Sequence, residues 1–144
     1  SKWVKISTPS IYKKVIQLEE KGYISSNIVK EGKMPEKAIY SLTEAGEKQL
    51  ENLMLEISAK PIQIFLDFNA VIVNLDALSP ENQIKCLTDI EANVKALKSY
   101  LEENLKAKEN VPEIPQTGLA VLQQQFVLAQ SIETWIEELK LKYE

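Results

Sequence analysis

Turn-forming residues divide the first part of the chain and strongly limit its fold. Pro9 fits the first position of a helix, where no backbone N–H is needed, and Thr8 before it is a suitable N-cap. Gly22 suits the left-handed position at which helices often end. The spacing therefore predicts a helix over about 9–21.

Two short strands are predicted after this helix. Residues 23–29 and 38–42 are rich in β-branched and aromatic side chains, and the polar stretch 30–37 between them contains Gly32 and Pro35. Thr43 can cap a further helix from 44, with apolar positions spaced to face a core at Leu50, Leu53, Met54 and Ile57. This order of elements is that of a winged helix, whose first helix in this series enters the DNA major groove.

The predicted helix over 9–21 has two unlike sides. At about 100° per residue, Ile11, Val15 and Leu18 fall together and are expected to pack inward. The opposite side is polar and positively charged, with Ser10, Lys13, Lys14, Gln17 and Lys21. Taken alone, such a side is typical of solvated surface; the hairpin that follows it favours DNA recognition.

Charge is distributed unevenly along the 144 residues. Through Leu42 there are eight lysines and four glutamates, a net charge of +4, whereas the remainder has nine lysines and seventeen acidic residues, a net charge of −8. Phosphate binding depends on clustered basic side chains, so only the N-terminal part is suited to nucleic acid.

Missing residue types exclude most catalytic and metal chemistry. The chain has no histidine, no arginine and a single cysteine, Cys86. Histidine-dependent triads and thiolate-rich metal sites are therefore ruled out, and we expect no enzyme activity and no cofactor. Paired glutamates such as Glu137-Glu138 are typical of solvated helix faces. The lone cysteine favours a reduced, cytoplasmic setting.

The C-terminal part is predicted to be helical. Residues 62–78 are apolar on nearly every side, which predicts a helix covered all round, although interrupting polar residues exclude a membrane span. Ser79, Pro80 and Glu81 form a helix start, and apolar steps of three and four predict a coiled-coil seam to about Lys108 at Leu87, Ile90, Val94, Leu97 and Leu101.

A last helix is predicted from Thr117-Gly118. Its near-heptad apolar positions are Leu119, Leu122, Phe126, Ala129, Ile132, Ile136, Leu139 and Tyr143, with Val121, Leu128 and Trp135 off that seam. This is more apolar surface than three isolated helices can bury among themselves, so a homodimer is expected. A self-contained monomeric three-helix bundle is the alternative.

Several segments together resemble the PadR family of winged-helix transcriptional regulators. They are Ser10-Ile11-Tyr12, then LEEKGYI from Leu18, the wing GKMPEKAIY from Gly32 to Tyr40, and LTEAG from Leu42. The last segment is shared by several winged-helix families, whereas the early Ile-Tyr combined with the Gly-x-x-Pro wing is more specific. The late run Trp135 to Leu139 is consistent with larger members, which dimerise through long C-terminal helices.

The resemblance implies a mainly α fold with a small β-hairpin. A winged helix-turn-helix, N-terminally incomplete here, is expected over 1–60, with 1–6 matching the end of the preceding helix, and a helical dimerisation domain over 61–144. The expected partners are double-stranded operator DNA, a second copy of the chain and a small-molecule effector of unknown identity, with no membrane. Repression from a pseudo-palindromic operator is the expected mode of action.

The implied DNA contacts come from the helix and the wing: Ser7, Thr8, Ser10, Tyr12, Lys13, Lys14, Gln17, Lys30, Lys33, Lys37 and Tyr40. Related wings often carry arginine, and Gln17 stands where an arginine is common. Because lysine lacks the bidentate fork that reads guanine, we expect phosphate attraction from the lysines and sequence selectivity from Ser10, Gln17 and DNA shape.

The implied dimerisation residues are Phe65, Phe68, Ile72, Leu97, Leu101, Leu122, Phe126, Ala129, Ile136 and Leu139. Two alternatives remain open. A winged-helix module that binds protein rather than DNA would suit Glu31, Glu36 and the missing arginines. A ligand sensor would need an effector pocket, for which the aromatic candidates are Trp3, Phe65, Phe68, Phe126 and Trp135.

Overall fold

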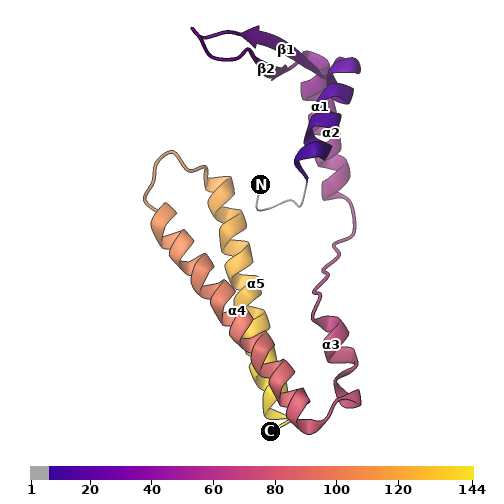
Figure 1. Cartoon of the computed structure of the whole chain (residues 1–144), viewed down its shortest axis with the longest axis vertical. Coiled ribbons are helices and arrows are strands. Elements are labelled where there is room, and N and C mark those ends of the chain that lie inside the picture. The colour runs from indigo at the N-terminus through magenta and orange to yellow at the C-terminus, as the bar shows by residue number, and fades with distance from the viewer. Residues whose placement is uncertain (1–6) are drawn as a thin grey trace. The chain divides into compact units, whose positions relative to one another are not determined.

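The computed structural model describes residues 7–144, so the expectations for 1–6, including Trp3, lie outside the described residues. Its elements follow in the order α1 (Thr8–Glu20), β1 (Ile24–Val29), β2 (Lys37–Leu42), α2 (Glu44–Ser58), α3 (Asn69–Val73), the 3₁₀ turn η1 (Leu75–Ala77), α4 (Pro80–Lys108) and α5 (Gln116–Leu141) (Figure 1). The predicted fold class, mainly α with one hairpin, is confirmed. The chain divides into two compact units, with Gln63 ending the first and Ile64 beginning the second.

Helix α1 starts one residue earlier than predicted. Ser7 is its extended N-cap and Thr8 is already helical, so the prediction of Thr8 as the cap is wrong. Pro9 tolerates this because any of the first four helical positions can lack an N–H without losing an intrahelical bond. The Ser7 hydroxyl lies 2.7 Å from that of Ser10 instead of binding a backbone N–H.

The end of α1 is a tight left-handed corner. Gly22 has φ +77°, and the backbone N–H of Tyr23 donates to the Leu18 carbonyl at 3.0 Å while that of Gly22 donates to Glu19 at 2.9 Å. These two bonds are the Schellman arrangement, which satisfies carbonyls that the helix leaves free. The predicted role of Gly22 is confirmed.

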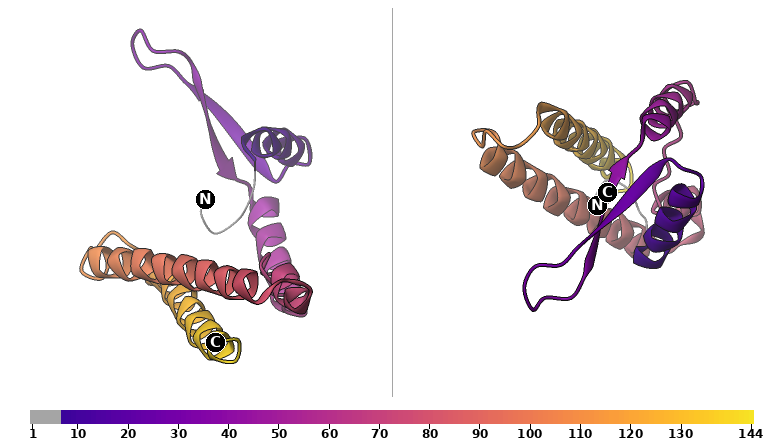
Figure 2. Two further views of the ribbon diagram at one scale, coloured as in Figure 1. Left: turned by 60° about the horizontal axis from the view of Figure 1, so that its bottom comes forward. Right: turned by 90° about the horizontal axis from the view of Figure 1, so that it is seen from above.

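Strands β1 and β2 form the predicted antiparallel hairpin, with Ile24 opposite Leu42 and Val29 opposite Lys37. Their loop turns at Gly32, which has φ +59°, and the Met34 N–H donates to the Glu31 carbonyl at 3.1 Å. Figure 2 shows the hairpin as a twisted ribbon whose loop projects well beyond α1. The loop thus extends away from the helix that precedes it.

Helix α2 begins as predicted, because the Thr43 hydroxyl accepts from the Gly46 N–H at 3.1 Å. Its apolar residues do not face a core: Leu50, Leu53, Met54 and Ile57 are between 41% and 64% exposed. In the same unit Ile11 is 48% and Leu18 36% exposed, and Val15 is half-buried. The predicted burial of these side chains is therefore wrong within residues 7–144, where the short hairpin covers little of either helix.

The predicted continuous helix over 62–78 is also wrong. Residues 61–66 have no regular structure, and only α3 and η1 follow. Asn and Asp side chains interrupt this stretch, and such side chains bond to nearby backbone in competition with a helix; at the end of α3 the Asn74 amide donates to the Ala70 carbonyl at 2.7 Å. One side of the segment is buried through Leu75, while Ile62 and Phe65 stay exposed.

Helices α4 and α5 pack side by side as an antiparallel hairpin (Figure 1). The Ser79 cap, the Pro80 start and the end at Lys108 are as predicted. On each helix the buried apolar residues recur every seven positions. They are Leu87, Val94 and Leu101 on α4, and Leu122, Ala129 and Ile136 on α5. Leu97, by contrast, is 48% exposed, so only part of the predicted apolar seam is buried between α4 and α5.

Charged pairs link the two helices of this hairpin. Lys98 lies 2.8 Å from Glu133, Lys95 lies 3.1 Å from Glu137, and Lys140 lies 3.0 Å from Glu91. Hydrogen bonds from Lys95 and Lys140 hold the pKa of the Glu91 carboxyl below its usual value. Among residues 7–144, no helix is long and apolar enough to cross a membrane.

Candidate nucleic-acid interface

The polar side of α1 is presented to solvent. Tyr12 is 70% exposed, and Lys13 and Lys14 are exposed beside it. Neither lysine forms an ion pair within the described part of the chain. Their charge is therefore available to an external anion.

The remaining predicted residues of α1 differ in accessibility. Ser7, Thr8 and Ser10 are exposed at the start of the helix, where free backbone N–H groups and the helix dipole favour a phosphate. Gln17 is half-buried one turn after Lys13 and Lys14. Gln17 thus has less freedom to reach a partner than the lysines.

The wing carries exposed lysines at both ends of its loop. Lys30 and Lys33 have no ion pair within residues 7–144, whereas Lys37 lies 3.7 Å from the Glu31 carboxylate. Both partners of that pair are more than half exposed, so the attraction is weak and screened. Tyr40 is 43% exposed, and the wing as a whole has a net positive charge close to its tip.

Helix α1 and the wing are joined at their common corner. Ser26 of β1 donates a hydrogen bond to the Glu19 carboxylate of α1 at 2.6 Å. The Thr43 hydroxyl donates to the Gly22 carbonyl at 2.6 Å, and the Thr43 N–H donates to the Tyr23 carbonyl at 3.1 Å. These bonds connect the end of α1 and the start of β1 with the end of β2.

The LTEAG segment predicted the cap at Thr43 but not the close packing of Gly46 at this corner. Gly46 is buried in the first turn of α2, and a Cβ added to it would lie 1.8 Å from the Tyr23 carbonyl oxygen. A glycine three residues after a capping threonine was the available signal, since glycine inside a helix lowers its stability unless close packing needs it.

The ten predicted dimerisation residues do not lie on one surface. Leu101, Leu122 and Ala129 are buried together inside the hairpin of their own chain, and Phe126 packs against them. Ile136 is buried in a second cluster with Leu75 and Leu87, against which Ile72 and Leu139 pack. These side chains have partners within their own chain, and their role in dimerisation stays a prediction; Leu97 and Phe65 are exposed at 48% and 84%, and Phe68 is half-buried.

The aromatic effector candidates are only partly brought together. Phe68 stacks on Trp135, with ring centroids 6.0 Å apart and an angle of 24° between their planes. Phe126 packs instead against the cluster of Leu101, Leu122 and Ala129, and Phe65 is mostly exposed. Of the described candidates, only Phe68 and Trp135 are therefore brought together, and an effector pocket stays a prediction.

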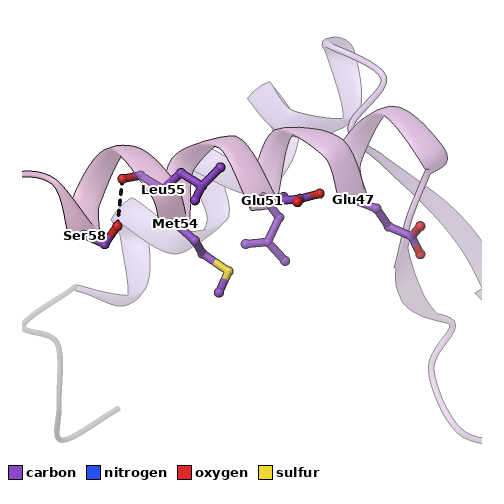
Figure 3. Close-up of a pocket in the computed structure, with 6 residues that line it drawn as sticks. Glu47, Glu51, Met54, Leu55 and Ser58 are labelled. Carbon is purple, nitrogen blue, oxygen red and sulfur yellow. Dashed lines mark hydrogen bonds between the residues drawn. The ribbon is translucent and has the colours of Figure 1, made fainter.

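A hollow of about 420 Å³ lies elsewhere, along α2. Figure 3 shows that its lining side chains, which include Glu47, Glu51, Met54 and Leu55, all come from this one helix. Ser58 closes one end and donates to the Leu55 carbonyl at 2.8 Å. The hollow is thus the open side of a helix rather than an enclosed ligand site.

Comparison with known proteins identifies the N-terminal unit. Residues 2–52 match the family model of the PadR-like transcriptional regulators. No curated protein matches the chain.

Solved structures match nearly the whole chain. Bacillus subtilis PadR in complex with operator DNA is 21% identical with a TM-score of 0.87, over 99% of this chain and 83% of that one. The same regulator in complex with p-coumaric acid is 18% identical with a TM-score of 0.79, over 96% and 77%. A PadR-like transcriptional regulator from Bacillus cereus is 19% identical with a TM-score of 0.67, over 97% and 78%.

The matched region contains α1, the complete hairpin and most of α2, which are the segments on which the resemblance was based. The likeness to solved structures extends the shared fold through α4 and α5. Residues 2–52 therefore belong to the PadR-like family of transcriptional regulators, and the chain has the winged-helix fold of that family's solved members.

Proposed function

We propose that this protein is a sequence-specific, double-stranded DNA-binding regulator that acts as a homodimeric repressor on a pseudo-palindromic operator. The observation that carries the proposal is the exposed, unpaired basic side of α1 next to a lysine-bearing wing. The fold similarity to a PadR in complex with operator DNA supports it. Occupying an operator is enough to block transcription, so repression requires no further surface.

Each group of side chains has a distinct role in this proposal. Lys13 and Lys14 contact phosphates beside the major groove, with Tyr12 next to them, while Ser7 and Thr8 meet phosphate at the start of α1. Ser10 and Gln17 contact base edges. In the wing, Lys30, Lys33, Lys37 and Tyr40 follow the adjacent backbone. Lysine binds phosphate as a point charge, so most affinity is expected to be electrostatic and salt-dependent.

The C-terminal unit supplies dimerisation in this proposal, with the functional boundary between residues 60 and 61. A second heptad on α5 lies one residue away from the buried one: Val121 is half-buried, Leu128 is 45% exposed and Trp135 is 39% exposed. With Leu97 of α4, these side chains offer an apolar surface to a second copy. Two-fold symmetry then spaces the half-sites by whole turns of DNA, about 34 Å each.

A planar aromatic acid is the proposed effector class. The Phe68–Trp135 stack links the segment before α4 to α5, and a ligand that separated these rings would change how that segment is held. The fold similarity to a PadR bound to p-coumaric acid supports this choice. Binding that favours one dimer geometry changes DNA affinity through linkage. With operator DNA as the proposed partner, a cytoplasmic location is proposed as well.

Mobility-shift titration against a promoter library, including the gene's own upstream region, tests the DNA proposal. The full chain should bind selected duplexes at low salt, and Lys13→Ala with Lys14→Ala should lower affinity across sequences. The slope of log affinity against log salt should flatten by about 0.9 for each lost phosphate contact. Lys142→Ala, an exposed lysine after α5, is the matched control. An unchanged slope would remove these two lysines from the interface.

Gln17→Ala tests base reading separately. It should change the ranking of bound sequences rather than lower all affinities equally, because a base contact discriminates whereas a phosphate contact does not. Equal loss on every sequence contradicts the assigned role.

Leu128→Glu tests the dimer surface. A buried charge at the interface should convert the dimer to a monomer in sedimentation equilibrium, whereas Gln130→Glu, at an exposed site on the same helix, should not. A stable dimer in the Leu128 variant would place the interface elsewhere.

Effector binding is tested by Trp135 emission in a Trp3→Phe background, with a panel of planar aromatic acids that includes p-coumaric acid. Quenching that disappears in Phe68→Leu supports the assigned site. No response across the panel contradicts the effector class.

A protein-binding winged helix is the second candidate. It is favoured by the Lys37–Glu31 pair, which offsets part of the wing's charge, and by the absence of arginine. Under this alternative no duplex is shifted even at low salt, and the mobility-shift titration separates the two.

A further inference from the structure

The α1–β1 corner is closed by a threonine and a glycine that do not belong to the DNA-contacting set. The hydroxyl of Thr43 makes two hydrogen bonds: it donates to the Gly22 carbonyl at 2.6 Å and accepts from the Gly46 N–H at 3.1 Å. The Thr43 backbone N–H adds a third, to the Tyr23 carbonyl at 3.1 Å. One residue thus contacts the end of α1, the start of β1 and the first turn of α2.

Gly46 allows the first turn of α2 to sit directly on this corner. A Cβ at this position would approach the Tyr23 carbonyl oxygen to 1.8 Å and the Tyr23 carbonyl carbon to 2.8 Å. Both are backbone atoms, so relief requires α2 to move away from the corner rather than a side chain to rotate. The same Tyr23 carbonyl accepts from Thr43, and this hydrogen bond would be strained by such a movement.

The corner is also where the two DNA-contacting elements meet. α1 ends at Glu20, β1 starts at Ile24 and β2 ends at Leu42 opposite Ile24. The loop with Lys33 lies at the far end of both strands, so a small rotation at the base becomes a larger displacement at the tip. Within the described residues, Ser26 to Glu19 is the other side-chain hydrogen bond between wing and α1, and it is exposed.

We propose that Thr43 and Gly46 are positioning residues that hold the wing at a fixed angle to α1, so that both contact the same DNA site at once. This inference rests on the proposed DNA-binding function. Neither residue contacts DNA; together they keep the corner closed, and preorganisation of this kind lowers the cost of binding.

Two measurements on the full chain test the proposal. The first is a double-mutant cycle on DNA affinity with Thr43→Val and Lys33→Ala. If Thr43 positions the wing, Lys33→Ala should weaken binding and flatten the salt slope in the native background but have little further effect in Thr43→Val. A threonine that merely keeps the protein folded would leave the effect of Lys33→Ala unchanged, because a lower folded fraction multiplies all affinities equally. Additive losses therefore overturn the proposal.

The second measurement needs no DNA, so it separates failure of this inference from failure of the proposed function. Spin labels are placed at Ile16→Cys and Glu36→Cys in a Cys86→Ala background, both at exposed sites. The distance distribution between them should be narrow in the native corner and in Thr43→Ser, which keeps the hydroxyl, but broad or displaced in Thr43→Val and Gly46→Ala. Circular dichroism confirms that each variant is folded. Unchanged distributions in folded Thr43→Val and Gly46→Ala would overturn the positioning role.

Discussion

Leu75→Ala should release residues 64–78, which precede α4 in the second unit, from the helical hairpin. Leu75 is 1% exposed and packs with Leu87 and Ile136, both fully buried. Removing three carbons loses about 2.4 kcal/mol of transfer free energy at about 0.8 kcal/mol per methylene. An unfilled cavity between two long helices adds about 1 kcal/mol, for a total of about 3–4 kcal/mol.

Leu78 is a matched control because it lies three residues later and is 37% exposed. Leu78→Ala loses only the buried part of the transfer term and leaves no enclosed cavity, so about 1.5 kcal/mol is expected. Urea unfolding of the full chain at fixed concentration, followed by Trp135 emission in a Trp3→Phe background, gives both values. Trp135 should also lose its Phe68 contact early in the Leu75 variant. Equal losses for the two variants would refute the anchoring role of Leu75.

Three further changes have defined outcomes. Gly22→Ala places a Cβ at φ +77° and should lower the stability of the first unit by about 1–2 kcal/mol in thermal denaturation, with Gly22→Asn milder; no loss would contradict the left-handed corner. Glu91→Gln should be less stable than native at neutral pH, and the difference should vanish in acid. The folded-state pKa of Glu91 is lowered, so its contribution is present above the unfolded pKa and disappears as pH falls through the folded one; a pH-independent difference would argue against this linkage. The Tyr143 hydroxyl donates to the Asp76 carboxylate at 3.0 Å, and this hydrogen bond raises the pKa of Tyr143. Tyr143→Phe removes the bond, so amide hydrogen exchange at the end of α5 should increase.

Short-range signals in the sequence located most element ends correctly. Ser79-Pro80, Thr43 and Gly22 act through hydrogen bonds or dihedral angles within a few residues, so no distant partner is needed to interpret them. Thr8 is the exception: a serine one residue earlier took the cap position, and Pro9 is compatible with either start. Such one-residue choices depend on small energy differences that a pattern does not resolve.

The proposed DNA-contacting residues could be listed from sequence because they lie on a short helix and a hairpin loop, where charged side chains are exposed; their role in DNA binding stays a prediction. The corner at Thr43 and Gly46 could not, because its close approach to Tyr23 joins residues more than twenty positions apart. The structure also separates Gln17, half-buried, from Lys13 and Lys14, which are exposed along the same side.

For the apolar residues of the C-terminal unit, the sequence predicted the helices, and the tertiary structure determined which side chains are buried. Heptad spacing alone determined that α4 and α5 are long helices with apolar seams, because the period of a helix is a local property. Tertiary structure decided which heptads are internal: Leu87 and Ile136 are buried against each other's helix, whereas Leu97 and Leu128 are left at the surface. It also decided that 62–78 is mostly not α-helical and that Leu75 is buried against Leu87 and Ile136, because which side of the segment packs depends on the helices it meets. Local hydrogen bonds determine where helices and strands start and end, whereas the burial of a side chain depends on which other element packs against that side of its helix.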